Sequence, residues 1–139
     1  MPADRMEVKK WLHQYRDALQ EAVECIERLD EADIVIKSPR MDGMPQAAAS
    51  GDNVERLAIL RVTLEARANR ARDKALRLAD EINDAIDGLA NSDQRRVLRL
   101  RYISGYCWEQ VAITMHMSLR TVHRVHGQAL NELRRARGE

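Results

Sequence analysis

The chain has 139 residues, enough for one domain or for one small domain on a helical stalk. Apolar residues make up 45% of it and charged residues 32%, whereas aromatic residues make up only 4%, so the composition favours long helices and an all-α fold. No apolar run is long enough to span a bilayer, and the first residues lack a secretory signal, so we expect a cytoplasmic protein. Cys25 and Cys107 form no CxxC pair, and free thiols are expected rather than a disulfide.

The net charge of +1 conceals a gradient along the chain. Residues 1–36 carry five basic and nine acidic side chains, a net charge of −4, whereas residues 92–139 carry nine basic and four acidic ones, a net charge of +5. A basic C-terminal unit indicates an anion-binding domain, with a surface for another partner elsewhere. Arginines also simply solvate helices, so charge alone leaves both interpretations open.

Two rows of apolar residues at alternating spacings of three and four predict two long N-terminal helices. The first row is Val8, Leu12, Tyr15, Leu19, Ala22, Ile26, Leu29 and Ile36, with Asp33 as a polar interruption, and the second is Leu57, Leu60, Leu64, Ala68, Ala71, Ala75, Leu78, Ile82, Ala85 and Leu89. This spacing is typical of a helical hairpin or a coiled coil. The helices could pack antiparallel on each other or against copies in another subunit, and the pattern does not choose between these arrangements.

Residues 1–91 are therefore interpreted as a helical stalk or oligomerisation region, with a flexible linker at residues 37–52. Two prolines and two glycines in this linker make a continuous helix improbable. A linker of this length is either a plain connector or a segment that docks on a partner.

Residues 92–139 have the pattern of a three-helix helix-turn-helix domain. Gly105 breaks the helical rhythm once, and His116-Met117-Ser118 breaks it again. Ser92, Cys107 and Ser118 stand where N-caps of the three helices are expected. Trp108 follows the first turn, and we expect its indole to wedge between the first two helices as part of a small core.

The third helix of this domain presents the candidate DNA-binding residues. Val122, Val125 and Ala129 are spaced to point inward, which leaves the start of the helix to face outward with Leu119, Arg120, Thr121, His123 and Arg124. Arg120 and Arg124 are one turn apart, and each guanidinium can bind a guanine edge or a phosphate. Two exposed arginines at this spacing also occur on solvated helices, but the surrounding turn, cap and core favour DNA contact.

The histidines invite a metal hypothesis that the pattern does not support. His116, His123 and His126 have no Cys, Asp or Glu nearby to complete a zinc ligand set, so no metal site and no cofactor are expected. His126 is expected to pack near the base of the helix and His123 to meet DNA. No nucleophile, paired carboxylates or phosphate-binding loop is arranged for chemistry, so an enzyme is not expected.

The segments RRVLRLRY, WEQVA, MSLRTVHRVHGQAL and NELRR resemble the fourth region of sigma-70-type factors, the domain that reads the promoter −35 element. Together with SPRMDGMP in the linker, they resemble even more the phage transcriptional regulators of the ArpU/RinA type. This resemblance implies double-stranded DNA and bacterial RNA polymerase as partners, with Arg120, Thr121, His123 and Arg124 at DNA and Leu119 beside them. Sigma domains often carry an acidic residue in place of Arg120, so the base preference does not carry over.

The sequence therefore predicts a sequence-specific transcriptional regulator of phage or prophage late genes, an activator or sigma-like accessory that works at the nucleoid of a bacterial host. We expect a homo-oligomer, a dimer through the N-terminal helices. A complete sigma factor is not expected, because the stalk has only Trp11 and Tyr15 where a promoter-melting region is rich in aromatics. Two rival functions are a phage small terminase subunit, which would assemble into a ring, and a helical protein-interaction adaptor without DNA binding.

Overall fold

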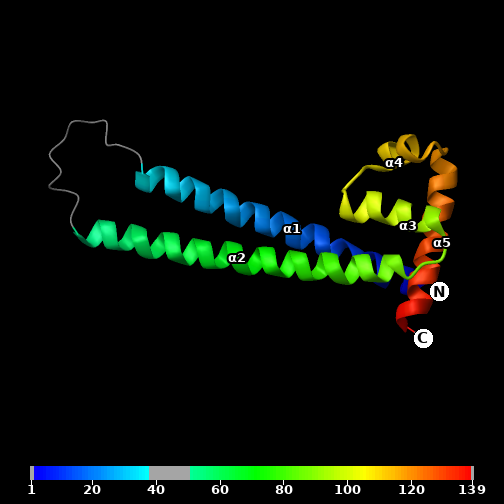
Figure 1. Ribbon diagram of the computed structural model, residues 1–139, viewed down its shortest axis with the longest axis horizontal. Coiled ribbons are helices and arrows are strands. Elements are labelled where there is room, and N and C mark those ends of the chain that lie inside the picture. Colours follow the sequence, from blue (N-terminus) through cyan, green and yellow to red (C-terminus); the bar gives the residue numbers. More distant parts are fainter. Residues whose placement is uncertain (1, 38–50, 139) are drawn as a thin grey trace. The chain divides into compact units, whose positions relative to one another are not determined.

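The computed structural model describes residues 2–37 and 51–138, and every regular element in these two segments is helical (Figure 1). The elements are α1 (Pro2–Lys37), α2 (Gly51–Asp87), α3 (Ser92–Leu98), the π-helical turn η2 (Arg99–Ile103), α4 (Trp108–Met115) and α5 (Leu119–Gly138). The expected all-α fold, with long N-terminal helices before a three-helix helix-turn-helix, is confirmed. None of the described helices combines the length and the apolar character that a membrane span requires.

The predicted flexible linker at residues 37–52 is described by the structure only at its two ends. Lys37 is the last residue of α1 and Gly51 is the first residue of α2, so helix reaches into the predicted range from both sides. The remainder of that range, residues 38–50, lies outside the described residues.

Contacts divide the chain into two compact units. The stalk unit is Leu19–Lys74, and the head unit is Met1–Ala18 together with Ala75–Glu139. Helices α1 and α2 each contribute to both units. The predicted domain boundary between residues 91 and 92 stays a prediction, but the helix-turn-helix shares its unit with the first part of α1 and the last part of α2.

Within the stalk unit, α1 and α2 run antiparallel. Asp33, the polar interruption in the first apolar row, accepts a 2.6 Å hydrogen bond from Nε of Arg61 in α2. The alanines of both rows face inward, since Ala22, Ala68 and Ala71 are all buried. Their small side chains allow the two helices to approach closely.

The head unit contains a core cluster that draws on both ends of the chain. Its buried residues are Val8, Leu12, Ile82, Ile86, Leu89, Leu98, Tyr102, Ala129, Leu130 and Leu133, from α1, α2, α3, η2, α5 and the joint after α2. Leu12, Ile86 and Leu133 have no solvent-exposed surface at all. Helix α5 is therefore held from behind by α1 and α2 as well as by α3 and η2.

A second core cluster lies within the helix-turn-helix itself. Its buried residues are Val97, Val111, Ala112, Met115, Val122 and Val125, and Trp108 packs against them while remaining half-buried. This arrangement agrees with the expected role of Trp108 as part of the core.

The joint between α2 and α3 is fixed by arginines. Nη1 of Arg95 donates hydrogen bonds to the backbone carbonyls of Leu89 at 2.6 Å and Ala90 at 3.1 Å, and Arg99 forms an ion pair with Asp87 at the end of α2. The expected N-cap at Ser92 is wrong by one residue. Asn91 caps α3 instead, because its side-chain Oδ1 accepts a hydrogen bond from the backbone N–H of Gln94 at 3.0 Å.

Replacing Leu12 tests whether α1 completes the core of the head unit. Leu12→Ala is expected to lower the free energy of unfolding by about 2–5 kcal/mol, because it removes a fully buried leucine and leaves a cavity. Urea unfolding followed by circular dichroism measures this change. Leu76→Ala in α2 is the control, since Leu76 is 58% exposed, and its effect should stay within about 0.5 kcal/mol. Equal effects of the two substitutions would show that α1 is not packed in this core.

Candidate nucleic-acid interface

The first turn of the helix-turn-helix begins with a widening of the helix. In η2 the backbone N–H of Ser104 donates to the carbonyl of Arg99 at 2.9 Å, five residues earlier, which is the π-helical pattern. Gly105 then adopts a φ of 76°, a conformation that side chains other than glycine rarely take. The predicted break at Gly105 is confirmed.

Cys107 caps α4, as the sequence predicts. Its extended backbone lets its side chain accept a hydrogen bond from the backbone N–H of Gln110. The backbone N–H of Cys107 in turn donates to Oε1 of Gln110 at 3.0 Å. This reciprocal pair satisfies two N–H groups that the start of a helix leaves free. The start of α4 is therefore set firmly against the first turn.

The second turn sets the start of α5. His116 ends α4 in the left-handed region, with φ of 55° and ψ of 43°. The hydroxyl of Ser118 then accepts a hydrogen bond from the backbone N–H of Thr121 at 3.1 Å. The predicted break at His116–Ser118 and the predicted N-cap at Ser118 are both confirmed.

The first turn and a half of α5 has the orientation that the sequence predicts. Val122, Val125 and Ala129 are buried, whereas the side chains of Leu119, Arg120, His123 and Arg124 are exposed. Thr121 is half-buried, and its hydroxyl lies 2.9 Å from the hydroxyl of Ser118. The five candidate residues therefore lie together at the start of one helix, and their contact with DNA stays a prediction.

Trp108 holds His123 in place beside this surface. The ring centroid of Trp108 lies 4.8 Å from that of His123 and 4.6 Å from that of His126, and the guanidinium carbon of Arg101 lies 4.6 Å from the Trp108 ring. This tilted contact with a half-buried indole restricts the rotamers of His123. The imidazole is thus both exposed and positioned.

Behind this surface, Tyr102 and His126 form a buried polar pair that the sequence pattern does not reveal. The hydroxyl of Tyr102 lies within hydrogen-bond distance, 2.7 Å, of Nε2 of His126, and the two residues are 2% and 6% exposed. Burial raises the pKa of Tyr102 to about 12 and lowers the pKa of His126 to about 4. At neutral pH both groups are therefore uncharged.

The buried His126 makes the stability of the head unit depend on pH. Because the pKa of His126 is about 4 in the folded protein and 6.5 when unperturbed, the unfolded chain binds more protons between these values. The stability from the neutral imidazole is complete above about pH 6.5 and is lost as pH falls toward 4. From about pH 7.5 to about pH 5, the free energy of unfolding should fall by about 2 kcal/mol. Urea titrations should show this loss in the wild-type protein and a smaller one in His126→Gln; equal losses would contradict the assignment.

Metal-ligating side chains and thiols are the groups that metal or redox chemistry would need. In the part of the chain that the structure describes, no group of three or more His, Cys, Asp or Glu side chains could hold a metal ion. Cys25 is half-buried and Cys107 is exposed, and both are free thiols.

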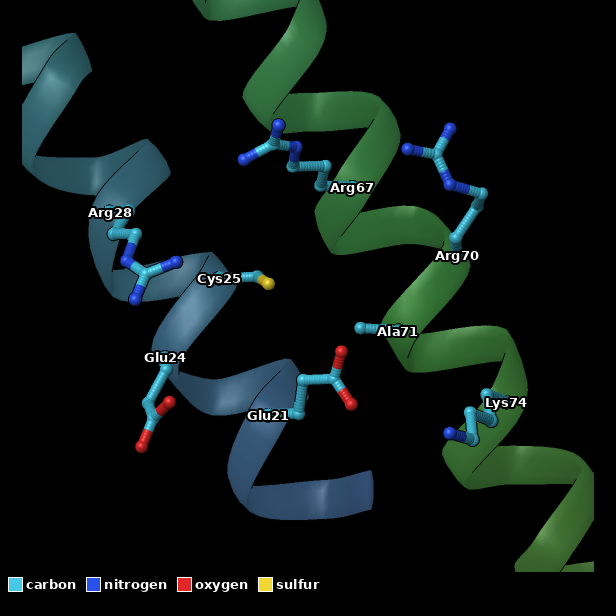
Figure 2. A pocket seen from close by; sticks show the side chains of 8 residues that line it. All are labelled: Glu21, Glu24, Cys25, Arg28, Arg67, Arg70, Ala71 and Lys74. Carbon is cyan, nitrogen blue, oxygen red and sulfur yellow. The ribbon is translucent and has the colours of Figure 1, made fainter. Parts of the chain in front are cut away.

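A cavity of about 420 Å³ lies between α1 and α2 in the stalk unit (Figure 2). Its lining residues are Glu21, Glu24, Cys25, Arg28, Arg67, Arg70, Ala71 and Lys74. Figure 2 shows Glu21 and Cys25 pointing toward α2, whereas Glu24 points away from it. The small side chain of Ala71 leaves room there, and charges of both signs surround it, which is typical of a solvated seam between helices.

Sequence reasoning missed contacts between α1 and the later turns of α5. Nε of Arg5 donates a hydrogen bond to Oδ1 of Asn131 in α5 at 2.8 Å, and the guanidinium carbon of Arg137 lies 3.9 Å from the ring centroid of Trp11. The available signal was the position of the basic residues, since four of the five basic side chains of residues 1–36 fall within residues 5–16.

Comparison with known protein families supports the helix-turn-helix assignment. Residues 85–135 match the family described as Sigma-70, region 4, a stretch that begins in the last turn of α2 and includes α3, η2, α4 and most of α5. Residues 85–135 therefore form a helix-turn-helix similar to Sigma-70, region 4, which supports DNA binding by this part of the chain. Comparisons with curated proteins and with solved structures gave no match.

Proposed function

We propose that this protein is a sequence-specific transcriptional regulator that binds duplex DNA at promoters through the start of α5. One observation carries the proposal. A domain of the Sigma-70 region 4 type presents an exposed, capped helix start whose edge is formed by Arg120, His123 and Arg124. In such domains the first residues of the recognition helix reach the base edges.

The chemistry of this edge suits the major groove. Each guanidinium of Arg120 and Arg124 can donate two parallel hydrogen bonds to O6 and N7 of guanine, and Leu119 or the methyl group of Thr121 can pack against a thymine methyl group. Backbone N–H groups at the start of α5 favour a phosphate oxygen. The apolar face formed by Val122, Val125 and Ala129 holds this edge outward.

The DNA-binding proposal can be tested without knowing the target sequence. Repeated selection from a library of random duplexes should yield a preferred site. On that duplex, Arg120→Ala and Arg124→Ala should each weaken binding by about 1–3 kcal/mol if they read bases, and much less on a scrambled duplex. Fluorescence anisotropy at fixed salt measures both. The control is Arg56→Ala, which removes an exposed arginine of the stalk unit. Failure of the wild-type protein to retain any duplex at low salt would refute the proposal and favour the adaptor.

The finer parts of this function have separate support. The resemblance to ArpU/RinA-type phage regulators supports a phage or prophage origin and a role at late genes. Sigma-70 region 4 domains work beside RNA polymerase, which supports the bacterial polymerase as a partner and the nucleoid as the place of action. We propose a binding role rather than a catalytic one, because the exposed edge formed by Arg120, His123 and Arg124 suits contact with DNA.

We also propose that the stalk unit joins two copies of the chain. Outward-facing apolar residues are present on both helices, with Ile34 at 66% exposure on α1 and Ile59 and Val62 at 60% and 63% on α2. Residues 19–35 of α1 carry six acidic and one basic side chain, whereas residues 53–74 of α2 carry six basic and three acidic ones. The acidic α1 of one copy therefore complements the basic α2 of another, which favours a dimer in which these faces meet.

Light scattering coupled to size exclusion tests this dimer. The wild-type protein should elute at twice the mass of one chain, and Ile59→Lys combined with Val62→Lys should shift it toward a monomer, because two charges then enter an apolar contact. Leu76→Lys is the control, since Leu76 is also exposed but lies outside the stalk unit. A ring of many subunits would favour the terminase alternative, and a wild-type monomer would contradict the dimer.

A further inference from the structure

Within the head unit, the N-terminal part of α1 carries a row of polar and basic side chains on one face. Arg5, Lys9, His13 and Arg16 follow one another at spacings of four, four and three residues, so they share one face of the helix. Lys10 is also exposed, but it lies about 100° around the helix axis from Lys9 and so on another face of α1. This row belongs to a segment outside the residues that match Sigma-70, region 4.

Three contacts align this row with the helix-turn-helix. Arg5 donates its hydrogen bond to Asn131 of α5, as described above. The ring of His13 meets the ring of Tyr102 edge-on at a centroid distance of 5.2 Å. Nη1 of Arg16 donates to the backbone carbonyl of Ile103 at 3.4 Å, next to the first turn. The row therefore has a defined place in the head unit.

Arg5 lies on the same line of α5 as the candidate base-reading arginines. Arg120, Arg124, Gly127 and Asn131 are spaced by four, three and four residues and share one face of α5, opposite its buried residues. A Cβ atom placed on Gly127 would lie 3.7 Å from Nη1 of Arg5, so the guanidinium of Arg5 lies over this glycine. Gly127 is about 10 Å along the helix axis from Arg120 at ~1.5 Å per residue.

That distance matches the position of a DNA strand. A helix that inserts its first turn into a major groove about 12 Å wide and about 8.5 Å deep must pass the phosphates at the rim of the groove within its next turns. A cation held over Gly127 is then close to those phosphates. Lys9 follows Arg5 one turn along α1 and continues the positive charge from α5 onto α1.

The electrostatics of the head unit agree with this geometry. Burial is the largest cause that lowers the pKa of His126, and electrostatic interactions with Lys9, His123, Arg101 and Arg5 follow in that order. Lys9 and Arg5 of α1 and Arg101 of η2 thus bring positive charge close to one point of the head unit. The positive charges in such a cluster repel one another in the free protein, and a bound anion reduces this repulsion.

We propose that Arg5 and Lys9 of α1 form a second DNA contact, which binds the phosphate backbone beside the groove that α5 enters. This proposal rests on the proposed DNA-binding function and adds to it a segment outside the helix-turn-helix. Phosphate contacts carry no sequence information, so Arg5 and Lys9 strengthen binding equally on all duplexes and fix how the domain lies on DNA.

The salt dependence of binding distinguishes this contact from a structural role. Each phosphate contact contributes about 0.9 to the slope of log Kd against log salt concentration. When salt rises from 50 to 200 mM, a variant that lacks one contact should therefore lose about 3.5-fold less affinity than the wild-type protein. Lys9→Gln and Arg5→Gln should each reduce the slope by about 1, on selected and scrambled duplexes alike. Fluorescence anisotropy over a series of salt concentrations measures the slope, and thermal unfolding confirms that each variant is folded.

Two further variants serve as controls. Lys10→Gln removes the same charge from another face of α1 and should leave the slope unchanged. Arg5→Lys loses the Nε donor to Asn131 but keeps the positive charge. Because the slope depends on that charge, this variant should retain the wild-type slope. If Lys9→Gln and Lys10→Gln gave the same slope, the second contact would be refuted even though Arg120→Ala still weakened binding. If Arg120→Ala and Arg124→Ala had no effect either, the proposed function itself would fail.

Discussion

The structure of the head unit depends on burying α1 and α2 behind the recognition helix. Leu130 and Leu133 of α5 pack in one cluster with Leu12 of α1 and with Ile82 and Ile86 of α2. A three-helix domain of fewer than 50 residues buries too little apolar surface to be strongly stable alone. The ends of the two long helices supply the missing surface, and the same contacts fix the direction in which α5 presents Arg120 and Arg124.

This packing gives the two core clusters different roles. The cluster around Val111 and Val122 holds α4 against α5 and sets the angle of the helix-turn-helix. The cluster around Leu12 and Leu133 connects that motif to the rest of the chain. Tyr102 belongs to the cluster around Leu12 and Leu133, and its hydrogen bond with His126 requires a more exact geometry than apolar contacts do. A surface that reads DNA needs such rigidity, because small displacements of a side chain weaken bidentate hydrogen bonds.

Local features of the helix-turn-helix could be predicted from the sequence, because short-range chemistry determines them. Gly105, Cys107 and Ser118 each satisfy a backbone requirement within a few residues of their own position, and the spacing of Val122, Val125 and Ala129 fixes which side of α5 faces outward. The cap of α3 was misassigned because Asn91 and Ser92 are adjacent and both suit an N-cap. The pairing of α1 with α2 remained open in the sequence, since an apolar row shows that a helix has a partner without showing which one.

Contacts between distant segments could not be predicted in this way. The net charge of residues 1–36 is acidic, which hides that Arg5, Lys9 and Arg16 share one face of the first turns of α1 with His13. Their neighbours in the fold, Asn131 and Tyr102, are more than 80 residues away in the chain. Only the tertiary structure brings this row beside the arginines of α5.

The most direct measurement is a nuclear magnetic resonance titration of the ¹⁵N-labelled protein with a selected duplex, with backbone and arginine side-chain signals assigned. Insertion of the recognition helix predicts the largest shifts at Leu119–Arg124, with smaller ones at the first turns of α1 and no comparable change in the stalk unit. Shifts confined to residues 19–35 and 53–74, with the signals of Arg120 and Arg124 unmoved, would contradict this account.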